Sequence, residues 1–449
     1  MTTTTTILHN VTIVDPEKRE HIPDQSIVID NGRITSVLPA SEVDLTSAAT
    51  VVQGQGHFAI PGMIDAHVHV RSLPHEGPSD ANPTPRLAPE DIDIDDLESY
   101  EKRLHTYLYC GVTSLYDAGN ERAAIFALRD AERNGRIRSP RIFCTGNLFT
   151  APGGHGSSVA VEVSPEDDIP ALVKAHLEYH PDVVKITYDE HNWGVRPLVP
   201  ILEKETLARI ITAVHLHGVK VTVHVSNELR AREAIAAGAD ILAHPVIQSP
   251  MTQEFADQLA KSRISVVSTL TIGDRYSRLA DHPEYLDLPL YRDCESAAER
   301  TRLQTEESTF QKANRWADWM RVMTPIAQAN LKMFIDAGGL LATGTDQSFG
   351  PDYHRELELL DAAGLSTWDI LFAATTGAAA AIDQSGKLGT FEPGALADIV
   401  LLRDDPIAAI ENLASIEHVV KGGQVIDRDA LKIPANDSPE ALVGAAALR

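Results

Sequence analysis

Hydrophobic residues in this chain gather in short runs. The pattern of hydrophobic and polar residues changes twice along the sequence, near residues 61 and 386. From residue 61 to about residue 386, apolar runs alternate with segments of helical periodicity, such as 121–134 and 205–217. Mainly apolar runs of this kind are typical of parallel strands that helices cover on both faces. Eight such runs occur: 63–70, 112–117, 142–145, 183–187, 220–225, 241–244, 264–270 and 340–346. The pattern predicts an α/β protein built on a TIM-type (β/α)8 barrel.

The two ends of the chain read as short strands joined by turns. Residues 7–14, 25–30 and 33–37 have strand-like patterns, and Asn31-Gly32 is a strong hairpin signal. Similar strands return at 389–402 and at 418–426, where Gly422-Gly423 predicts a second hairpin. We expect residues 1–60 and 387–432 to form one small discontinuous β-sandwich beside the barrel of residues 61–386. The tail 433–449 has little pattern and is expected to lack regular structure.

Two insertions interrupt the barrel pattern after its first and seventh runs. Residues 71–98 are rich in proline and then acidic, whereas residues 271–335 read as helical and contain Trp316 and Trp319. Both follow the carboxyl ends of predicted strands, where a barrel keeps its active site. A lid or pocket wall and a simple extra pair of packed helices remain equal alternatives.

Composition narrows the class of partner. The chain has 39 Lys and Arg against 64 Asp and Glu, a formal charge of −25, which disfavours nucleic acid and anionic membranes. Its three cysteines are widely spaced and give no disulfide framework. No secretory signal and no apolar run of about 18 residues is present. We therefore expect a cytoplasmic protein that acts on a small-molecule substrate.

The first barrel run carries a pair of histidines that suits a metal ion. His67 and His69 are two positions apart, so on a strand their side chains leave the same face. On a helix the two would diverge. Two imidazoles that point together can hold one metal.

Further metal-competent residues lie in later runs, at the ends that face the predicted active site. These residues are Lys185, His224, His244 and Asp346. One histidine at a strand end is usually a satisfied core residue, but four histidines and an aspartate in this pattern are difficult to explain that way. Lys185 is the sharpest anomaly, because a charged lysine in a barrel core is costly unless it is paired or chemically altered.

These residues carry a resemblance to the metal-dependent amidohydrolase superfamily. Their order matches its binuclear subtype, and the flanks 61–67 and 393–398 also resemble those of the family. The resemblance implies that Lys185 is carboxylated and bridges two divalent metals, for which Zn²⁺ is expected. It also implies that His67, His69 and Asp346 hold one metal, that His224 and His244 hold the other, and that the protein forms homo-oligomers.

The loop 150–156 resembles the Gly-Gly-His-Gly loop of the imidazolonepropionase-related branch, which includes prolidases and ochratoxin-hydrolysing amidases. The resemblance places His155 near the substrate, where it steadies an oxyanion or a substrate carboxylate. Tyr188 is a candidate hydrogen-bond donor to a substrate carbonyl, with a structural aromatic as the alternative. The chain departs from prolidases in the bulky segment 186–193, in which Trp193 is a candidate for an apolar subsite.

Three other histidines, His75, His191 and His354, are expected in loops near the mouth of the site, the first two as pocket candidates.

The sequence thus predicts a binuclear metal-dependent hydrolase that cleaves the amide bond of a small N-acyl amino acid, a dipeptide or a xenobiotic amide. A metal-bridging hydroxide attacks, and Asp346 transfers the proton to the leaving amine. Hydrolysis of a cyclic amide, carbamate or lactone on the same site stays open, as does a non-catalytic scaffold. Lys185 argues against a ring deaminase, because mononuclear deaminases of the superfamily lack the bridging lysine.

Overall fold

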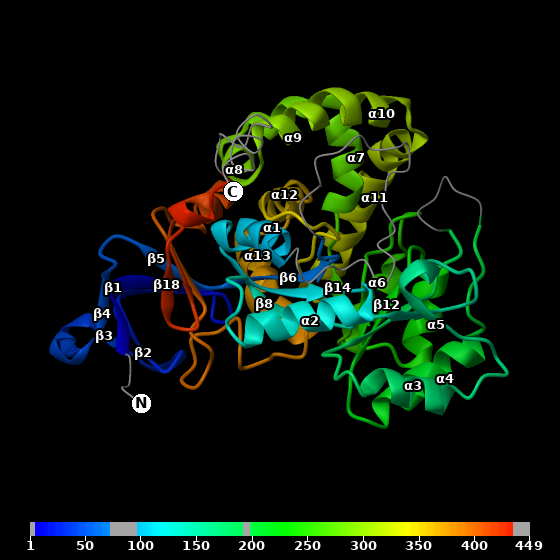
Figure 1. The fold of residues 1–449 in the computed structure, drawn as a ribbon, viewed down its shortest axis with the longest axis horizontal. Coiled ribbons are helices and arrows are strands. Elements are labelled where there is room, and N and C mark those ends of the chain that lie inside the picture. Colours follow the sequence, from blue (N-terminus) through cyan, green and yellow to red (C-terminus); the bar gives the residue numbers. More distant parts are fainter. Residues whose placement is uncertain (1–4, 72–96, 192–197, 434–449) are drawn as a thin grey trace, which may run out of the picture.

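The computed structural model describes residues 5–71, 97–191 and 198–433. Figure 1 shows a central group of parallel strands with helices around it, a sheet at one side and a helical layer at one end. His75, Trp193, most of the loop 71–98 and the tail 434–449 lie outside the described residues.

All eight predicted barrel runs form strands. They are β6 (Met63–Val68), β7 (Val112–Asp117), β8 (Arg141–Cys144), β11 (Val184–Thr187), β12 (Val221–His224), β13 (Ile241–Leu242), β14 (Ser265–Val267) and β15 (Leu340–Ala342). Every pairing between neighbours in this series is parallel. Two short strands were not predicted, β9 (Leu148–Thr150) and β10 (Ala160–Glu162), because runs of three residues carry no periodic signal.

The eight strands belong to two parallel sheets rather than to one continuous ladder. The first sheet is β6-β7-β8, and the second runs β10-β9-β11-β12-β13-β14-β15. At one junction Val68 forms a parallel bridge with Gln347, which follows β15. At the other, the Asp182 N–H donates to the Cys144 carbonyl at 3.0 Å. In the part of the chain that the structure describes, a fully laddered barrel is therefore not formed.

Helices follow most of these strands and cover the sheets. They are α1 (Leu97–Tyr109), α2 (Arg122–Arg133), α3 (Ile169–Leu177), α4 (Lys204–His215), α5 (Glu228–Ala237), α6 (Gln253–Ser262), α12 (Pro351–Ala362), α13 (Thr367–Phe372) and α14 (Ala378–Ala381). Several begin with a side-chain cap, as where Asn227 accepts from the Arg230 N–H and Thr252 from the Phe255 N–H. The two helices predicted at 121–134 and 205–217 are α2 and α4.

The second insertion is helical, as predicted. It contains α7 (Thr271–Asp281), α8 (Pro289–Cys294), α9 (Ala297–Arg302), α10 (Ser308–Ala313) and α11 (Arg315–Asp336), which form the upper layer in Figure 1. Glu356 on α12 fixes the start of α7, because its carboxylate accepts the backbone N–H groups of Leu270 and Thr271 at 3.0 and 2.7 Å. The insertion is thus anchored at the carboxyl end of β14.

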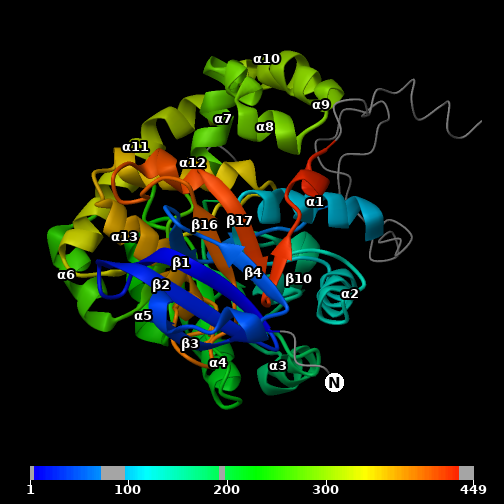
Figure 2. The same ribbon diagram turned by 90° about the vertical axis from the view of Figure 1, so that its left-hand side faces the viewer.

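Strands from both ends of the chain share one mixed sheet. It contains β1 (Thr5–Asp15), β2 (Glu20–Asp30), β3 (Arg33–Pro39), β4 (Thr50–Gln53), β5 (Phe58–Pro61), β16 (Ile399–Leu402), β17 (Ile416–Lys421) and β18 (Gln424–Ile426). Antiparallel pairing of β5 with β16 joins the two pieces, and Figure 2 shows this sheet facing the viewer. Arg141 on β8 holds it to the parallel strands through two bonds to buried Asp398, at 2.7 and 2.9 Å.

No helix among the described residues is long and apolar enough to cross a membrane.

Candidate metal centre

The carboxyl ends of five parallel strands bring the predicted metal-binding residues together. His67 and His69 come from β6, Lys185 from β11 and His224 from β12, and the remaining two, His244 and Asp346, directly follow β13 and β15. The rings of neighbouring histidines lie 4.4 to 5.5 Å apart between centroids. A set that spans 279 positions of the chain (67 to 346) is therefore one compact cluster.

Three members of the cluster are already arranged as metal ligands. One ligand atom each from His67, His69 and Asp346 lies within 4.8 Å of the others. The Asp346 Oδ1 is 3.2 Å from His69 Nε2 and 3.7 Å from His67 Nε2. A carboxylate and two imidazoles at this spacing match the donor set that divalent zinc prefers.

The orientation of both imidazoles is fixed from behind. His67 Nδ1 bonds the Ala243 carbonyl at 3.1 Å, and His69 Nδ1 bonds the Gly119 carbonyl at 2.7 Å. Because a carbonyl only accepts, each Nδ1 carries the proton and each Nε2 offers a lone pair. The His67 Nε2 atom is buried and has no hydrogen-bond partner among the described residues. A buried, unmatched lone pair is costly in a folded protein, and a metal ion would satisfy it.

His224 and His244 form the other side of the cluster. Their rings meet edge to face at 4.4 Å, and His244 lies 4.6 Å from His67. Asp189 holds His224 through its Nε2 at 3.3 Å, while Thr269 holds His244 through its Nδ1 at 2.9 Å. These two bonds fix the orientation of both rings toward the centre.

Lys185 lies in the middle of these groups and is 2% exposed. Its backbone N–H donates to Thr145 Oγ1 at 3.0 Å, but its side chain forms no ion pair with the described residues. Burial lowers the pKa of Lys185 to about 7, although Asp346 and Asp117 act to raise it. The lysine predicted as anomalous is thus buried, weakly basic and surrounded by histidines.

Electrostatics keep three of the four histidines neutral. His69 differs, because burial acts to lower its pKa but Asp346 outweighs burial and raises it. Burial lowers the pKa of both His67 and His244 well below the ordinary value, and the nearby Lys185 acts in the same direction. Burial also lowers the pKa of His224 despite its bond to Asp189. Neutral imidazoles are the form that binds metal, so these residues need not lose a proton at neutral pH.

Asp346 occupies an unusual backbone conformation. Its φ of +53° lies in the left-handed region, which residues other than glycine rarely adopt. Its N–H donates to the His67 carbonyl at 2.7 Å, and Asp65 holds the preceding residue, Thr345, through its N–H and hydroxyl. Strain of this kind persists where surrounding bonds over-determine the geometry, and it is common at functional sites.

His155 lies beside the cluster, as predicted. Its ring stacks on that of His224, with centroids 4.4 Å apart and an interplanar angle of 23°. The loop needs glycine before it, because a Cβ at Gly154 would lie 2.5 Å from Thr150 Oγ1 and 2.9 Å from the Ala151 carbonyl. The Gly-Gly-His-Gly segment therefore brings the imidazole to the edge of the centre.

Tyr188 is not brought to the cluster. Its side chain is buried beneath α5, where its hydroxyl donates to Glu233 at 2.8 Å and the Arg230 guanidinium lies 5.6 Å from its ring centre. Lys185 and Tyr188 are three positions apart on an extended segment, so their side chains leave opposite faces. This geometry argues against the expected contact between the Tyr188 hydroxyl and substrate.

The other loop histidines are also resolved in part. His354, expected in a loop, lies in α12, where it is buried and its Nε2 bonds the Cys110 carbonyl at 2.9 Å. The sequence around His354 looks like a loop because Pro351, which begins the helix, hides the helical pattern. His191 lies at the end of the described segment after β11, and its N–H donates to Asp189.

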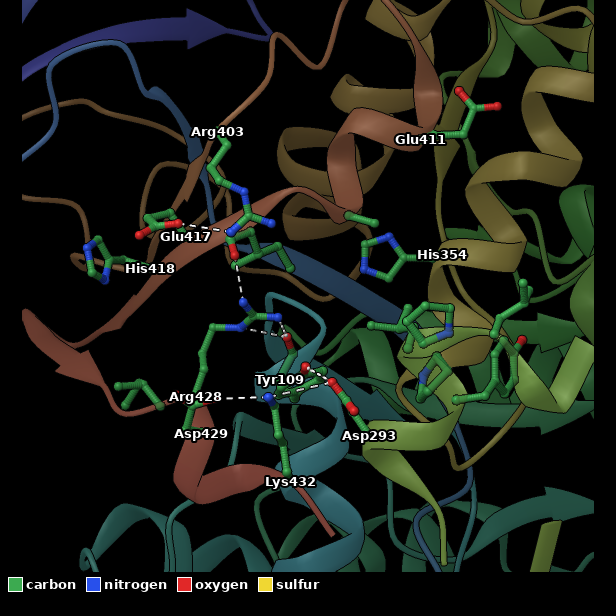
Figure 3. Close-up of a pocket in the computed structure, with 18 of the residues that line it drawn as sticks. Tyr109, Asp293, His354, Arg403, Glu411, Glu417, His418, Arg428, Asp429 and Lys432 are labelled. Atoms are coloured by element: carbon green, nitrogen blue, oxygen red, sulfur yellow. Dashed lines mark hydrogen bonds and ion pairs between the residues drawn. The ribbon is translucent and has the colours of Figure 1, made fainter. Parts of the chain in front are cut away.

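A different pocket, between α12, α8 and the sheet strands β17 and β18, is the other candidate site (Figure 3). It has a volume of about 1090 Å³. Its labelled basic residues are engaged: Arg403 pairs with Glu417 at 2.9 Å, Lys432 with Asp429 at 3.0 Å, and Arg428 donates to backbone carbonyls. We refer to this cavity as the sheet–helix pocket.

Sequence reasoning missed the residues that support the ligands. Asp189 and Thr269 orient two histidines, Asp65 binds Thr345, and Asp117 accepts from the N–H groups of Val70 and Gly119. Each of these acids or hydroxyls lies at or just beyond a strand end, beside a predicted ligand. That proximity was the signal available in the sequence.

The fold and this centre agree with a family match. Residues 58–426 match the model of the Amidohydrolase family, so the chain belongs to that family. The imidazolonepropionase of Thermoanaerobacter pseudethanolicus is 23% identical over 437 residues and is covered, like this chain, to 86%. Uncharacterized proteins of Mycobacterium tuberculosis match at 25% identity over 263 residues, and the matched chain spans 62% of their length.

Solved structures share the fold at low sequence identity. A prolidase in complex with N-methylphosphonate-L-proline has a TM-score of 0.75 and 21% identity, with 94% of this chain and 99% of that chain covered. Phenylurea hydrolase B has a TM-score of 0.76 and 20% identity, with 97% and 100% covered. These likenesses indicate a TIM-barrel with an additional domain.

Proposed function

We propose that this protein is a metal-dependent hydrolase of C–N bonds that holds two divalent metal ions. Its substrate is the amide of a small N-acyl amino acid, a dipeptide or a xenobiotic amide. The observation that carries the proposal is the buried, unmatched Nε2 of His67 beside Asp346 and His69. The named neighbours and the family match support the same class of reaction.

Lys185 is the proposed bridge between the two ions. A lysine whose pKa is about 7 presents a neutral amine at neutral pH in a substantial fraction of molecules. A neutral amine adds to carbon dioxide, forming an N–C bond and releasing one proton, and the product is a carbamate anion. Carboxylation would thus convert the buried Lys185 amine into an anion, which can bind the positively charged metals.

The remaining ligands divide into two sets. His67, His69 and Asp346 would hold one ion, while His224 and His244 would hold the other, for which we expect Zn²⁺. When bound, the metals supply Lewis acidity and lower the pKa of water toward about 7. No step below requires a ligand atom other than those that the five strand ends already bring together.

Asp346 is the proposed proton carrier. Its carboxylate accepts a proton from the attacking water and gives it to the nitrogen of the leaving amine. Burial acts to raise the pKa of Asp346, but His67 and His69 outweigh it and keep the pKa below the usual range. The ionised, proton-accepting form is therefore the resting form.

His155 is the proposed partner of the scissile carbonyl. Its imidazole stacks on that of His224, a proposed ligand, and so lies beside the proposed centre. An N–H donated to the carbonyl oxygen would stabilise the negative charge that develops there. We expect His155→Ala to lower kcat and leave the metal content unchanged, whereas loss of metal would make His155 a ligand.

We further propose that the eight parallel strands close into a (β/α)8 barrel over residues 61–386. The Val68–Gln347 bridge and the Asp182–Cys144 bond support closure at the two breaks in the ladder. Residues 1–60 and 387–432 form the additional domain, since β5 pairs with β16. Homo-oligomers remain part of this proposal.

The function is tested by turnover with and without metal. The purified protein is assayed against N-acyl amino acids, dipeptides and carbamates, first as prepared, then after chelation, and then after Zn²⁺ is restored. We expect amide hydrolysis that chelation abolishes and Zn²⁺ restores. A chelated, metal-free protein that keeps its full rate would contradict the proposal, and so would a metal-loaded protein that hydrolyses none of these substrates.

A further inference from the structure

Arg275 on α7 has no carboxylate within ion-pair distance among the described residues. Its Nη1 donates to the side-chain Oε1 of Gln347 at 2.5 Å, and among the described residues no carboxylate oxygen lies within 4.0 Å of its guanidinium. Two other arginines near it are paired, since Arg355 binds both oxygens of Asp274 and Arg321 binds both oxygens of Asp281. Arg275 is half-buried, so part of its surface stays accessible to a ligand.

Asp352 acts on this charge electrostatically, but it forms no ion pair with Arg275 within 4.0 Å among the described residues. Asp352 on α12 faces Arg275, but one of its oxygens accepts from the Tyr291 hydroxyl at 3.1 Å. The other oxygen, Oδ2, is buried and has no hydrogen-bond partner in the part of the chain that is described. A half-buried guanidinium that bonds only a neutral amide retains most of its donors for an anion.

Gln347 places this cation next to the proposed metal centre. It follows Asp346 directly in the chain, and its carbonyl accepts the His69 N–H at 3.3 Å. It also bridges to Val68 at the end of β6. The residue that holds Arg275 is therefore tied to two proposed metal ligands, and α7 itself begins at the carboxyl end of β14.

We propose that Arg275 binds the carboxylate of the substrate, and that the substrate is an amide whose amine portion carries a free carboxylate. N-acyl amino acids and dipeptides with a free C-terminus belong to this class. The inference rests on the proposed amide hydrolysis and selects within it the substrates whose amine portion bears an anion. The planar guanidinium matches a carboxylate with two parallel N–H donors, and the bond to Gln347 fixes its orientation.

Paired substrates and two variants test the assignment. Each N-acyl-L-amino acid, such as N-acetyl-L-leucine, is compared with its decarboxylated analogue, N-isoamylacetamide. We expect Arg275→Gln to raise the KM for the carboxylate substrate roughly 10- to 100-fold, with little change for the analogue. Arg275→Lys keeps the charge and should recover part of the loss. Arg278→Gln, on the same helix and also without a carboxylate within 4.0 Å among the described residues, serves as the matched control.

Binding without turnover separates this inference from the proposed function. Titration calorimetry of the metal-loaded protein with N-acetyl-L-leucine should show binding that Arg275→Gln weakens and Arg278→Gln retains. If N-acetyl-L-leucine binds in this way but is never hydrolysed, the proposed function fails and the carboxylate site stands. If Arg275→Gln changes neither KM nor binding, or changes both substrates of a pair equally with a loss of metal, the inference is overturned.

Discussion

The proposed metal centre and the sheet–helix pocket treat their polar groups in opposite ways. In the pocket, Arg403 and Glu417 neutralise each other, and Lys432 binds Asp429 (Figure 3). In the centre, His67 Nε2 has no hydrogen-bond partner and Lys185 has no ion pair among the described residues. Polar groups that pair with each other within the protein need no ligand, whereas the unmatched groups of the centre need a bound ion. That difference locates function better than cavity size does.

The largest effect is expected from removing the central lysine. Lys185→Ala deletes the proposed bridging ligand, so we expect loss of both metals and a fall in kcat/KM of at least about 1000-fold. Metal content by plasma emission spectrometry and steady-state kinetics measure the two effects.

Lys220→Ala is the matched control for this substitution. Lys220 precedes β12 and pairs with Asp383 at 2.9 Å on the surface, so its loss should leave metal and rate unchanged. A Lys185→Ala protein that retained two metals would contradict the proposal that Lys185 bridges them. Carbon dioxide should matter as well: metal loading of the wild type in carbonate-free buffer should fall, and bicarbonate should restore it.

The pocket should show its contribution in stability rather than in rate. Burial lowers the pKa of His354 to about 4, below its ordinary value of 6.5. The unfolded chain therefore binds the proton first as pH falls, and this residue makes stability decrease between about pH 6.5 and pH 4. We expect His354→Gln to remove up to about 3 kcal/mol of that decrease, as measured by urea unfolding at pH 4 and pH 7.

The same substitution tests whether the two regions are independent. His354→Gln should leave kcat at pH 7 unchanged, because the residue bonds the Cys110 carbonyl and not a proposed ligand. A parallel pH profile of unfolding in the wild type and the variant would contradict the assigned role of His354.

A smaller effect is expected where a ligand is supported from behind. Asp189 accepts from His224 and from the Ser226 hydroxyl, and it is 2% exposed. Asp189→Ala should weaken the second metal by 10- to 100-fold in affinity, since supporting partners of ligands usually contribute this much. The measurement is a competition titration with a chromophoric chelator.

Glu190→Gln provides the comparison for Asp189. Glu190 is the next residue, but it pairs with Arg230 on α5 and bonds no histidine of the centre among the described residues. Equal metal affinity in Asp189→Ala and the wild type would contradict the proposal that Asp189 supports His224.

The smallest effect is expected inside the pocket. Glu417→Gln breaks the ion pair with Arg403, whose side chains are 36% and 55% exposed, so it should change stability by less than about 1 kcal/mol. Activity and metal content should be those of the wild type. A marked loss of activity in this variant would mean that the pocket, and not the centre alone, takes part in function.

Sequence patterns predicted the strands well and their ends poorly. The runs 264–270 and 340–346 are longer than β14 and β15, because the chain leaves the ladder before the apolar pattern stops. Thr269 and Asp346 have φ values of +37° and +53°, which turn their side chains away from a regular strand. Periodicity reports burial, not hydrogen bonding, and so it cannot locate such turns.

The sequence shows the proposed ligands as a pattern, but it does not show the residues that support them. Residues in the order His-x-His, Lys, His, His and Asp carry a recognisable pattern, whereas Asp189 or Thr269 is one polar residue among many. Tyr188 shows the opposite error, since strand alternation from Lys185 already placed its side chain on the other face. Arg275 had no sequence signal, because only the folded chain shows that its side chain bonds Gln347, the residue after Asp346.

The central claim is that the enclosed, unmatched groups of the centre exist to hold two metal ions. The most direct measurement is the metal content of the purified protein at full activity, per chain, by plasma emission spectrometry. We expect two divalent ions per wild-type chain and none in the Lys185→Ala protein. A fully active protein that contains one ion per chain, or none, would contradict it.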